Sequence, residues 1–502
     1  MTRQIAVALV ALAVMIGATL AADRVVAAPV APSAAYTEQV DVSSGTWYCV
    51  PLPRRDEAAT LTVAAVGDEA SRVAIENFED GEATFADERR ELAPNETLEL
   101  ELDGAAEAPP AVVVRWSGGP VVASWTADAS DGQRLGASCS PSPAPRWLVS
   151  GAVTTVGSTT RLYLFNPFDS DAVVRVAFAT PEGRQDLVSS ENVSVPARQV
   201  VDVDITELQP EQPDLGMIVE VEAGRVIATG LQSFGQPDLP EIELEGAELS
   251  TDPTAPEGRT VLPATATDAT TAGFAYAAAG QATSSWITVL NPNTRPARLT
   301  MTASDEIASD TGGEELVVAP ESVARIELDS ASSSPNFGVA LRSTNDTTFV
   351  ANGFLALTGD DKRVAAIPGV TALDRSSAQA AAPDGSNPEV AVFNPGDTTA
   401  TLAINIGGSA PGTWSSVEVA PGAMELLPAA DEGVDGGSPV TIAADQPVYG
   451  ALRLSAEDRV AGLLTLPLLP AASWTGSAEA VAPERDQTLE TRRVDFPVQP
   501  ES

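Results

Sequence analysis

The chain has 502 residues, with 70 acidic and 28 basic side chains and a formal net charge of −42. It contains no histidine, which excludes Ser-His-Asp and Cys-His catalysis and most zinc sites. So acidic a surface repels nucleic acid and anionic lipid, because proteins bind both by neutralising phosphate with cations. We therefore expect no nucleic-acid partner, and membrane contact only through the N-terminal segment.

The N-terminal segment has the features of an export sequence. Arg3 supplies a positive charge, and the apolar run Ile5–Ala22 follows it. As a helix this run would be about 27 Å long at 1.5 Å per residue, which is long for a signal peptide and short for a membrane span. We predict that residues 1–28 are a cleaved signal peptide or an uncleaved signal anchor. Either one places the rest of the chain outside the cytoplasm, secreted or anchored by this helix.

The chain has two cysteines, Cys49 and Cys139, which flank the first predicted domain. Disulfides persist in exported proteins, so we predict that these two residues pair. A reactive thiol is the alternative, but neither cysteine lies in a C-x-x-C motif or beside a histidine.

A repeated pattern organises the rest of the chain. An apolar strand ends in an Asn-Pro pair three times, at Asn166, Asn291 and Asn394. A proline that precedes another alternating strand follows each asparagine by 30, 29 and 27 residues, at Pro196, Pro320 and Pro421. Proline cannot donate to a β-ladder and so ends a strand, and Asn-Pro favours a turn. We therefore interpret the three asparagines as turn-formers.

A fourth, earlier copy of the pattern places Ala65-Val66 where the others have Asn-Pro, 29 residues before Pro94. Each copy consists of short alternating strands separated by turns, and helical periodicity is absent beyond the leader. This pattern is typical of β-sandwiches. We predict an all-β protein of tandem immunoglobulin-like β-sandwich repeats that follow an N-terminal signal or anchor helix.

The Asn-Pro pairs and the prolines that follow them set the expected domain boundaries. The four β-sandwich repeats are expected at 36–143, 144–245, 259–372 and 373–475. A linker is expected at 246–258 and a disordered tail at 476–502. The Pro/Ser stretch 140–145 is expected to be a short stiff hinge between the first two repeats.

Several of these motifs resemble a known family. They are Trp47-Tyr48-Cys49, a second cysteine before a proline-rich hinge, Arg146-Trp147, and Leu164-Phe165-Asn166-Pro167-Phe168. The chain is similar over residues 45–470 to a family of exported actinobacterial proteins known only as a domain of unknown function. The resemblance implies an envelope location and a β-sandwich build. It carries no activity and no catalytic residues.

Two sets of residues are candidates for ligand binding. Acidic turns could bind calcium, although none matches the twelve-residue calcium loop; they are Asp169-Ser170-Asp171, Ser304-Asp305-Glu306 and Asp360-Asp361. We interpret them as ordinary turn residues and predict no metal site. The tryptophans could stack on sugars or pack in cores; they are Trp47, Trp116, Trp125, Trp147, Trp286, Trp414 and Trp474.

These observations favour a non-catalytic protein with no cofactor. We expect an exported cell-envelope protein that acts as a spacer or interaction module, with a cell-wall component or an envelope protein as partner. A carbohydrate-binding module of the cell wall is the alternative, and it needs neighbouring tryptophans on one surface. A carboxylate-dependent hydrolase is a third hypothesis, and it needs two acids roughly 5–10 Å apart in a cleft.

Overall fold

The computed structural model describes residues 44–470 with internal gaps. The segments left out within this range are 53–56, 80–81, 84–87, 104–108, 129–132, 236–255, 281–282, 305–314, 358–361, 381–385, 409–411, 430–436 and 457–458. The expected leader at 1–28 and the expected tail at 476–502 lie outside the described residues. In the described part of the chain, no helix has the length and apolar character needed to cross a membrane.

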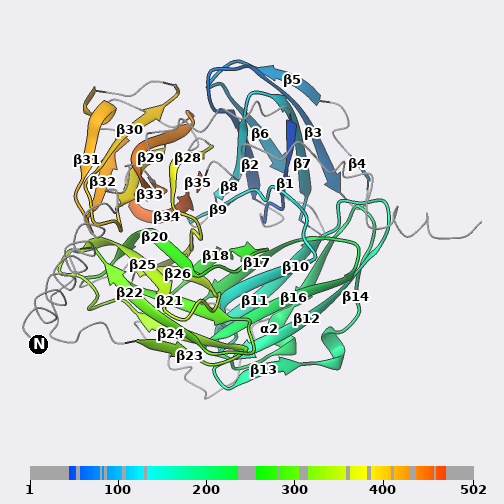
Figure 1. Ribbon diagram of the computed structural model, residues 1–502. Helices are drawn as coiled ribbons and strands as arrows, with labels where there is room; N and C mark the ends of the chain where they lie inside the picture. The colour runs from blue at the N-terminus through cyan, green and yellow to red at the C-terminus, as the bar shows by residue number, and fades with distance from the viewer. Residues whose placement is uncertain are drawn as a thin grey trace, which may run out of the picture. The chain divides into compact units, whose positions relative to one another are not determined.

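The described chain is almost entirely β-structure (Figure 1). Its helical elements are one short α-helix and two short 3-10 helices: α2 (Ile205–Leu208), η1 (Val188–Ser190) and η2 (Gly412–Ser416). The strands are antiparallel and form sheets in pairs, which confirms the prediction of an all-β chain built from sandwich-like repeats.

Each repeat has a first sheet, which contains the first strand of the repeat, and a second sheet. The final strand of the second sheet in sequence order is called the last strand of the repeat. In the first repeat, the first sheet is β1 (Ser44–Cys49), β7 (Ala111–Gly118), β3 (Ser71–Glu79) and β4 (Glu82–Ala83), with β5 (Glu88–Leu92) also on β3. The second sheet is β6 (Thr97–Asp103), β2 (Ala58–Ala65), β8 (Val121–Asp128) and β9 (Arg134–Ser138).

The second repeat has the same strand order. Its first sheet is β10 (Arg146–Ala152), β16 (Leu215–Ala223), β12 (Ala172–Thr180) and β13 (Gly183–Asp186), with β14 (Val193–Val195) on β12 and β19 (Ala264–Thr265) on β10. Its second sheet is β15 (Val200–Asp204), β11 (Ser158–Phe165), β17 (Ile227–Phe234) and β18 (Gly258–Leu262).

The third repeat again follows this order. Its first sheet is β20 (Thr271–Ala278), β25 (Asn336–Ser343), β22 (Ala297–Ala303) and β23 (Leu316–Val318). Its second sheet is β24 (Ser322–Glu327), β21 (Thr283–Asn291), β26 (Val350–Leu357) and β27 (Arg363–Pro368).

The fourth repeat differs in one respect, because a single long strand, β33 (Val440–Ala456), belongs to both sheets. Its first half lies between β28 (Asp374–Gln379) and β30 (Ala400–Ile406), and its second half lies between β29 (Ser386–Phe393) and β34 (Arg459–Pro467). The other strands are β31 (Val417–Val419) on β30, β32 (Met424–Pro428) on β29 and β35 (Leu469–Pro470) on β28.

The strand order within a repeat is not the one found in constant-type immunoglobulin domains. There the first strand pairs with the second strand. Here β1 pairs with β7 and lies in the opposite sheet to β2. The likeness to immunoglobulin domains is therefore that of two packed antiparallel sheets.

One expected boundary needs correction. Residues 246–258 were expected to be a linker and 259 was expected to open the third repeat. Instead β18 pairs with β17 from Gly258 to Leu262 and completes the second sandwich. The acidic segment before β18 looks like a domain boundary in the sequence, but it interrupts the second repeat between its last two strands.

The expected hinge at 140–145 is also held by β-type hydrogen bonds. Ser140 and Tyr48 exchange two backbone hydrogen bonds of 2.8 Å, and the Ala144 N–H donates to the Val226 carbonyl at 3.0 Å. This stretch is therefore fixed to both the first and the second sandwich.

The Asn-Pro turns explain why a second proline follows each asparagine at a nearly constant distance in the sequence. The side chain of Asn394 is buried, and its Nδ2 donates to the Thr398 carbonyl at 2.8 Å and to the Val419 carbonyl at 3.0 Å. Its Oδ1 accepts from the Gly396 N–H at 3.0 Å. Asn166 and Asn291 make the same bonds. Each asparagine thus ties its own turn to the strand that precedes the second proline of its repeat, which is Pro196, Pro320 or Pro421. The prediction that these asparagines form turns is confirmed.

Many central strands are buried on both faces. Residues 121–127 of β8 and 350–356 of β26 are all buried. The reason is that the second sheet of each repeat packs on the first sheet of the repeat before it. The Phe165 ring lies 5.9 Å from the Phe78 ring between centroids, and Gly273 lies against the Tyr449 ring, where a larger side chain would collide.

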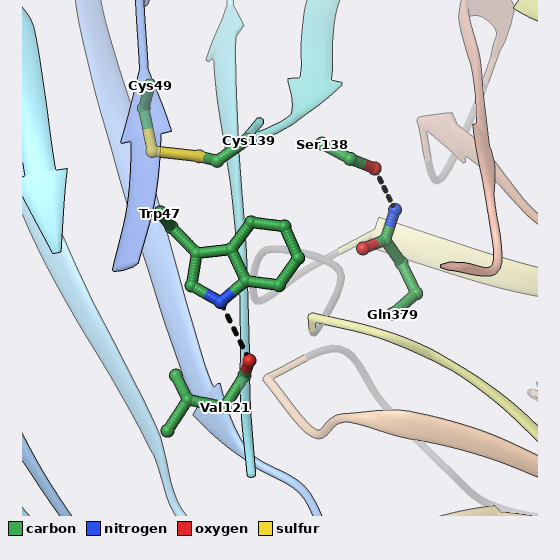
Figure 2. Close-up of a disulfide and its surroundings, with 6 residues drawn as sticks. All are labelled: Trp47, Cys49, Val121, Ser138, Cys139 and Gln379. Atoms are coloured by element: carbon green, nitrogen blue, oxygen red, sulfur yellow. Dashed lines mark hydrogen bonds between the residues drawn. A yellow bond between two sulfur atoms is a disulfide. The ribbon is translucent and has the colours of Figure 1, made fainter. Parts of the chain in front are cut away.

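The four repeats form a closed cycle of contacts. The last strand of each repeat lies against the last strand of the next, in the order β9, β18, β27, β34 and back to β9. Between β18 and β27, the Ala366 N–H donates to Thr260 Oγ1 at 2.7 Å. Between the fourth and first repeats, Gln379 Nε2 donates to Ser138 Oγ at 2.9 Å (Figure 2).

A buried ion pair joins the first two repeats at this cycle. Both Arg259 and Glu57 are almost fully buried, and Arg259 Nη2 donates to the two carboxylate oxygens of Glu57 at 2.6 and 2.7 Å. The Arg259 backbone N–H also donates to Gln133 Oε1 at 2.6 Å. Charges removed from water are stable only when they are paired and hydrogen-bonded in this way.

Candidate functional site: a cavity shared by the four repeats

A cavity of about 420 Å³ lies where the four last strands meet. Equivalent residues of all four repeats line it. In the first repeat this residue is Gly136, two positions before Ser138 at the end of β9. In the second, third and fourth repeats it lies two positions before a proline and is Val261, Ala366 and Thr465. Such volumes are typical of small-molecule sites, which span roughly 300–1,000 Å³. Each repeat thus contributes one segment to a common wall.

The wall arises because the chain leaves each last strand and crosses to the first strand of the same repeat. In the third repeat, Val370 and Gly273 exchange two backbone hydrogen bonds of 2.9 Å after this crossing. A proline marks the crossing in three repeats, at Pro263, Pro368 and Pro467. Proline ends a strand because it cannot donate to the ladder. This recurrent apolar-proline pair is visible in the sequence and was missed there.

In the first repeat a disulfide stands at the crossing. Cys49 on β1 is bonded to Cys139, which follows β9, with the two Cα atoms 4.6 Å apart (Figure 2). Ser138 occupies the position of the prolines in the other repeats. The predicted pair is therefore present, and it adds a covalent bond to a contact that the other repeats make through hydrogen bonds.

Among the residues that the structure describes, no aspartate, glutamate, lysine or arginine lines the cavity. Its side chains are apolar or carry neutral hydroxyl and amide groups. Burial raises the pKa of Tyr48, which also lines it, to about 12, so this phenol is neutral at physiological pH. The described residues of this wall therefore include no acid pair of the kind that the hydrolase hypothesis requires.

Two polar side chains of the wall differ in their hydrogen bonding. Asn352 Nδ2 donates to the carbonyls of Ser150 at 3.1 Å and Pro263 at 3.0 Å, so the amide holds the second and third repeats together. The Thr465 hydroxyl on β34 is buried and has no hydrogen-bond partner. A buried hydroxyl without a partner carries an uncompensated desolvation cost of about 1–3 kcal/mol.

The tryptophans do not form an exposed platform within the described residues. Six are buried, and Trp474 lies outside the described residues; the six are Trp47, Trp116, Trp125, Trp147, Trp286 and Trp414. Trp47 and Trp147 are equivalent anchors. Trp47 Nε1 donates at 2.7 Å to the Val121 carbonyl (Figure 2), and Trp147 Nε1 donates at 2.7 Å to the Val226 carbonyl. Only core packing is thus observed for this group, although Trp125 and Trp147 also reach the cavity wall.

The acidic turns show no arrangement for calcium in the described part of the chain. Asp169 pairs with Arg198 at 2.6 Å, and Asp171 Oδ1 accepts from the Ala197 N–H at 3.0 Å. Asp305-Glu306 and Asp360-Asp361 lie outside the described residues. Among the described residues, no group of three or more metal-ligating side chains is present.

A second hollow lies on the first repeat and is basic. Arginines from three neighbouring strands line it: Arg72, Arg89, Arg90 and Arg115. Acidic residues accompany them, since Glu91 also lines the hollow and Arg115 pairs with Glu76 at 3.0 Å. These carboxylates offset much of the positive charge, so the central cavity is the better candidate.

The fold and the cavity together define a class of protein: four sandwich-like repeats closed into a cycle around an uncharged cavity. Comparison with protein families gives the particular assignment. Residues 121–420 match a family of unknown function (DUF5719), and the chain belongs to this family. The match begins at β8 and ends after β31, so it covers the second and third repeats and parts of the first and fourth. No curated protein matches the chain.

Proposed function

We propose that this chain is an exported, non-catalytic interaction module of the cell envelope that binds through the cavity shared by its repeats. The single observation that supports binding is a small-molecule-sized cavity with contributions from all four repeats. None of the described residues that line it is charged, which argues against acid-base or metal-assisted chemistry at this place.

The closed cycle favours interaction over spacing. A spacer gains length with each repeat that is added end to end. Here the first and fourth repeats contact each other through Ser138 and Gln379, so the repeats do not extend away from one another. A compact arrangement of this kind suits a protein that presents a fixed site.

The carbohydrate-binding alternative is retained in an altered form. The surface platform that it required is absent among the described tryptophans. The cavity offers instead a neutral wall with hydroxyl groups and two tryptophans, Trp125 and Trp147. Sugars are bound by such combinations of aromatic surface and polar groups.

Export rests on the leader and is tested separately. A fusion of residues 1–28 to a reporter that is active only outside the cytoplasm should be active, and the same fusion with Leu9→Arg and Leu12→Arg should not. Charges in the apolar run oppose membrane insertion. Equal activity of the two fusions would contradict export through this segment.

Binding is tested by co-sedimentation of the full chain with isolated cell-wall polysaccharide, with calcium and with a chelator. We expect saturable binding that is independent of calcium. Absence of binding in both conditions would remove the cell wall as the partner. Binding only with calcium would contradict the assignment of the acidic turns as purely structural.

A further inference from the structure

We propose that the basic hollow on the first repeat binds a phosphate group carried by a small molecule. The hollow measures about 550 Å³ and lies on the first sheet of this repeat, across β3, β5 and β7. None of the described residues that line it also lines the central cavity, so it is a second site. Three observations support it: the register of the arginines on the sheet, the balance of charge around them, and the different balance on the second repeat.

The β-register brings arginines to two sides of a small residue. Arg89 on β5 and Arg115 on β7 both lie opposite Ala74 on β3. Residues directly opposite each other point to the same face of a sheet, and adjacent strands are about 4.8 Å apart. The Cα atoms of the two arginines therefore flank Ala74 at a separation of about 10 Å. Arg72, two residues before Ala74, points to the same face, so the alanine forms the floor of the hollow and arginines line its sides.

The second repeat covers only part of this face. Phe78 lies further along β3 and is buried, with its ring 5.9 Å from the Phe165 ring of the second repeat. Ala74 is half-buried, and Arg72 and Arg89 are exposed. The uncovered part of the face is therefore the part that carries the arginines, and a ligand can reach them from solvent.

Positive charge exceeds negative charge among the described side chains of the hollow. Four arginines line it: Arg72, Arg89, Arg90 and Arg115. Two carboxylates accompany them, since Glu91 also lines the hollow and Glu76 pairs with Arg115 at 3.0 Å. An arginine has five N–H donors, and a bidentate carboxylate accepts from two of them. An arginine that already has a carboxylate partner can therefore still donate to a phosphate.

The equivalent face of the second repeat has a different balance. In strand order, β12 and β16 correspond to β3 and β7. Arg175 is the fourth residue of β12, as Ala74 is of β3, and it lies opposite Glu220 where Ala74 lies opposite Arg115. Arg175 is 3.9 Å from Glu220 and 3.5 Å from Glu191, so carboxylates of the chain itself surround this guanidinium. The excess of arginine on the first repeat is thus not a consequence of the sheet that the two repeats share.

The arrangement of the donors favours phosphate over carboxylate. A carboxylate presents two oxygens in one plane, whereas a phosphate group presents three acceptor oxygens in different directions and about −1.5 to −2 charges. Guanidinium groups on opposite sides of Ala74 can therefore bond different oxygens of one phosphate.

The net charge of the chain limits the size of the ligand. A polyanion such as nucleic acid would bring many further charges against a chain of formal net charge −42. A small anion is screened from charges beyond about 8 Å at physiological ionic strength, so it responds mainly to the arginines around it. The ligand is therefore a small molecule.

The test uses the full chain, with inorganic phosphate, glycerol 2-phosphate and acetate titrated by calorimetry in chloride buffer. We expect the phosphates to bind saturably and acetate to bind at least about tenfold more weakly. Arg72→Gln and Arg89→Gln should each weaken phosphate binding about tenfold, because each removes a charge-assisted hydrogen bond. Arg175→Gln, at the position of Ala74 in the second repeat, is the matched control and should leave phosphate binding unchanged.

Melting temperatures distinguish loss of the ligand contact from loss of the fold. Arg72 and Arg89 are exposed, so their variants should melt at the temperature of the wild type. Ala74→Glu places a carboxylate on the floor of the hollow and should abolish phosphate binding. Failure of both phosphates to bind would overturn the proposal, as would acetate binding as tight as that of phosphate. Wild-type affinity in the Arg72 and Arg89 variants, or an equal loss in Arg175→Gln, would also overturn it.

Two sources can supply the phosphate group, and the probes separate them. Tighter binding of glycerol 2-phosphate than of inorganic phosphate would assign the hollow to phosphomonoesters, and equal or weaker binding would assign it to inorganic phosphate; either result supports a phosphate site. Failure of phosphate binding would leave the proposed function intact, because that function depends on the central cavity and is measured by co-sedimentation with wall polysaccharide.

Discussion

Replacement of Asn394 by alanine should strongly destabilise the fourth repeat. The Asn394 amide donates to the carbonyls of Thr398 and Val419 at 2.8 and 3.0 Å and accepts from the Gly396 N–H at 3.0 Å. The side chain is 1% exposed, so water cannot easily replace these bonds. Alanine would leave one backbone donor and two carbonyls without their partner.

The expected cost follows from the number of orphaned groups. Each buried polar group without a partner costs about 1–3 kcal/mol. Local relaxation will admit some water at the turn, so we expect a total of about 3–5 kcal/mol rather than the full sum. Asn394→Asp keeps the acceptor and loses the donor, and it should be destabilised by a similar amount at neutral pH.

Urea unfolding monitored by tryptophan fluorescence measures this effect, because Trp414 is buried in the same repeat. Asn405→Ala, a half-buried asparagine on β30, is the control and should cost less than about 1 kcal/mol. Asn166→Ala and Asn291→Ala repeat the experiment in the second and third repeats. A loss of less than about 1 kcal/mol in the free energy of unfolding at all three turns would refute the view that the asparagine holds its turn to the strand before the second proline.

Three further predictions follow from features of the chain. Cys49→Ser with Cys139→Ser should cost at most about 4–5 kcal/mol, since the bond closes a loop with a sequence separation of 90; equal urea midpoints for the two proteins would contradict this. Arg259→Leu or Glu57→Leu alone should each cost about 3–5 kcal/mol, and the double variant less than their sum; a double-mutant cycle with additive losses would show that the pair is not coupled. Burial raises the pKa of three tyrosines to about 12, so the free energy of unfolding should fall between pH 10 and 12 by as much as about 1.4 kcal/mol per pH unit for each, measured by phenolate absorbance during unfolding. A normal titration near pH 10 in the folded protein would contradict it; the tyrosines are Tyr48, Tyr163 and Tyr449.

Local pattern was sufficient to predict the type of structure in each repeat. Alternating strands such as Ala172–Thr180, and the strand-ending Asn-Pro pairs, specify antiparallel strands and turns through interactions within one repeat. The disulfide between Cys49 and Cys139 followed in the same way from their positions at the two ends of one domain.

The arrangement of the repeats was not predictable from these patterns. Residues 121–127 of β8 and 350–356 of β26 are all buried, and packing between repeats therefore shows in the sequence only as a loss of alternation. It does not specify which repeat covers which. The cavity depends on β9, β18, β27 and β34 meeting, and the proline pairs that mark it have a meaning only once the crossing to the first strand is known.

Closure of the cycle also imposes an order on folding. Ser138 and Gln379 are 241 residues apart, so the seam between the first and fourth repeats cannot form until nearly the whole chain has left the ribosome. Until then, the outer face of the second sheet of the first repeat has no cover, and its apolar residues on β8 are open to wrong partners. Contacts this distant in sequence form slowly. The packing of the first repeat is therefore complete only when the fourth repeat has folded. Truncation of the fourth repeat should thus also destabilise the first.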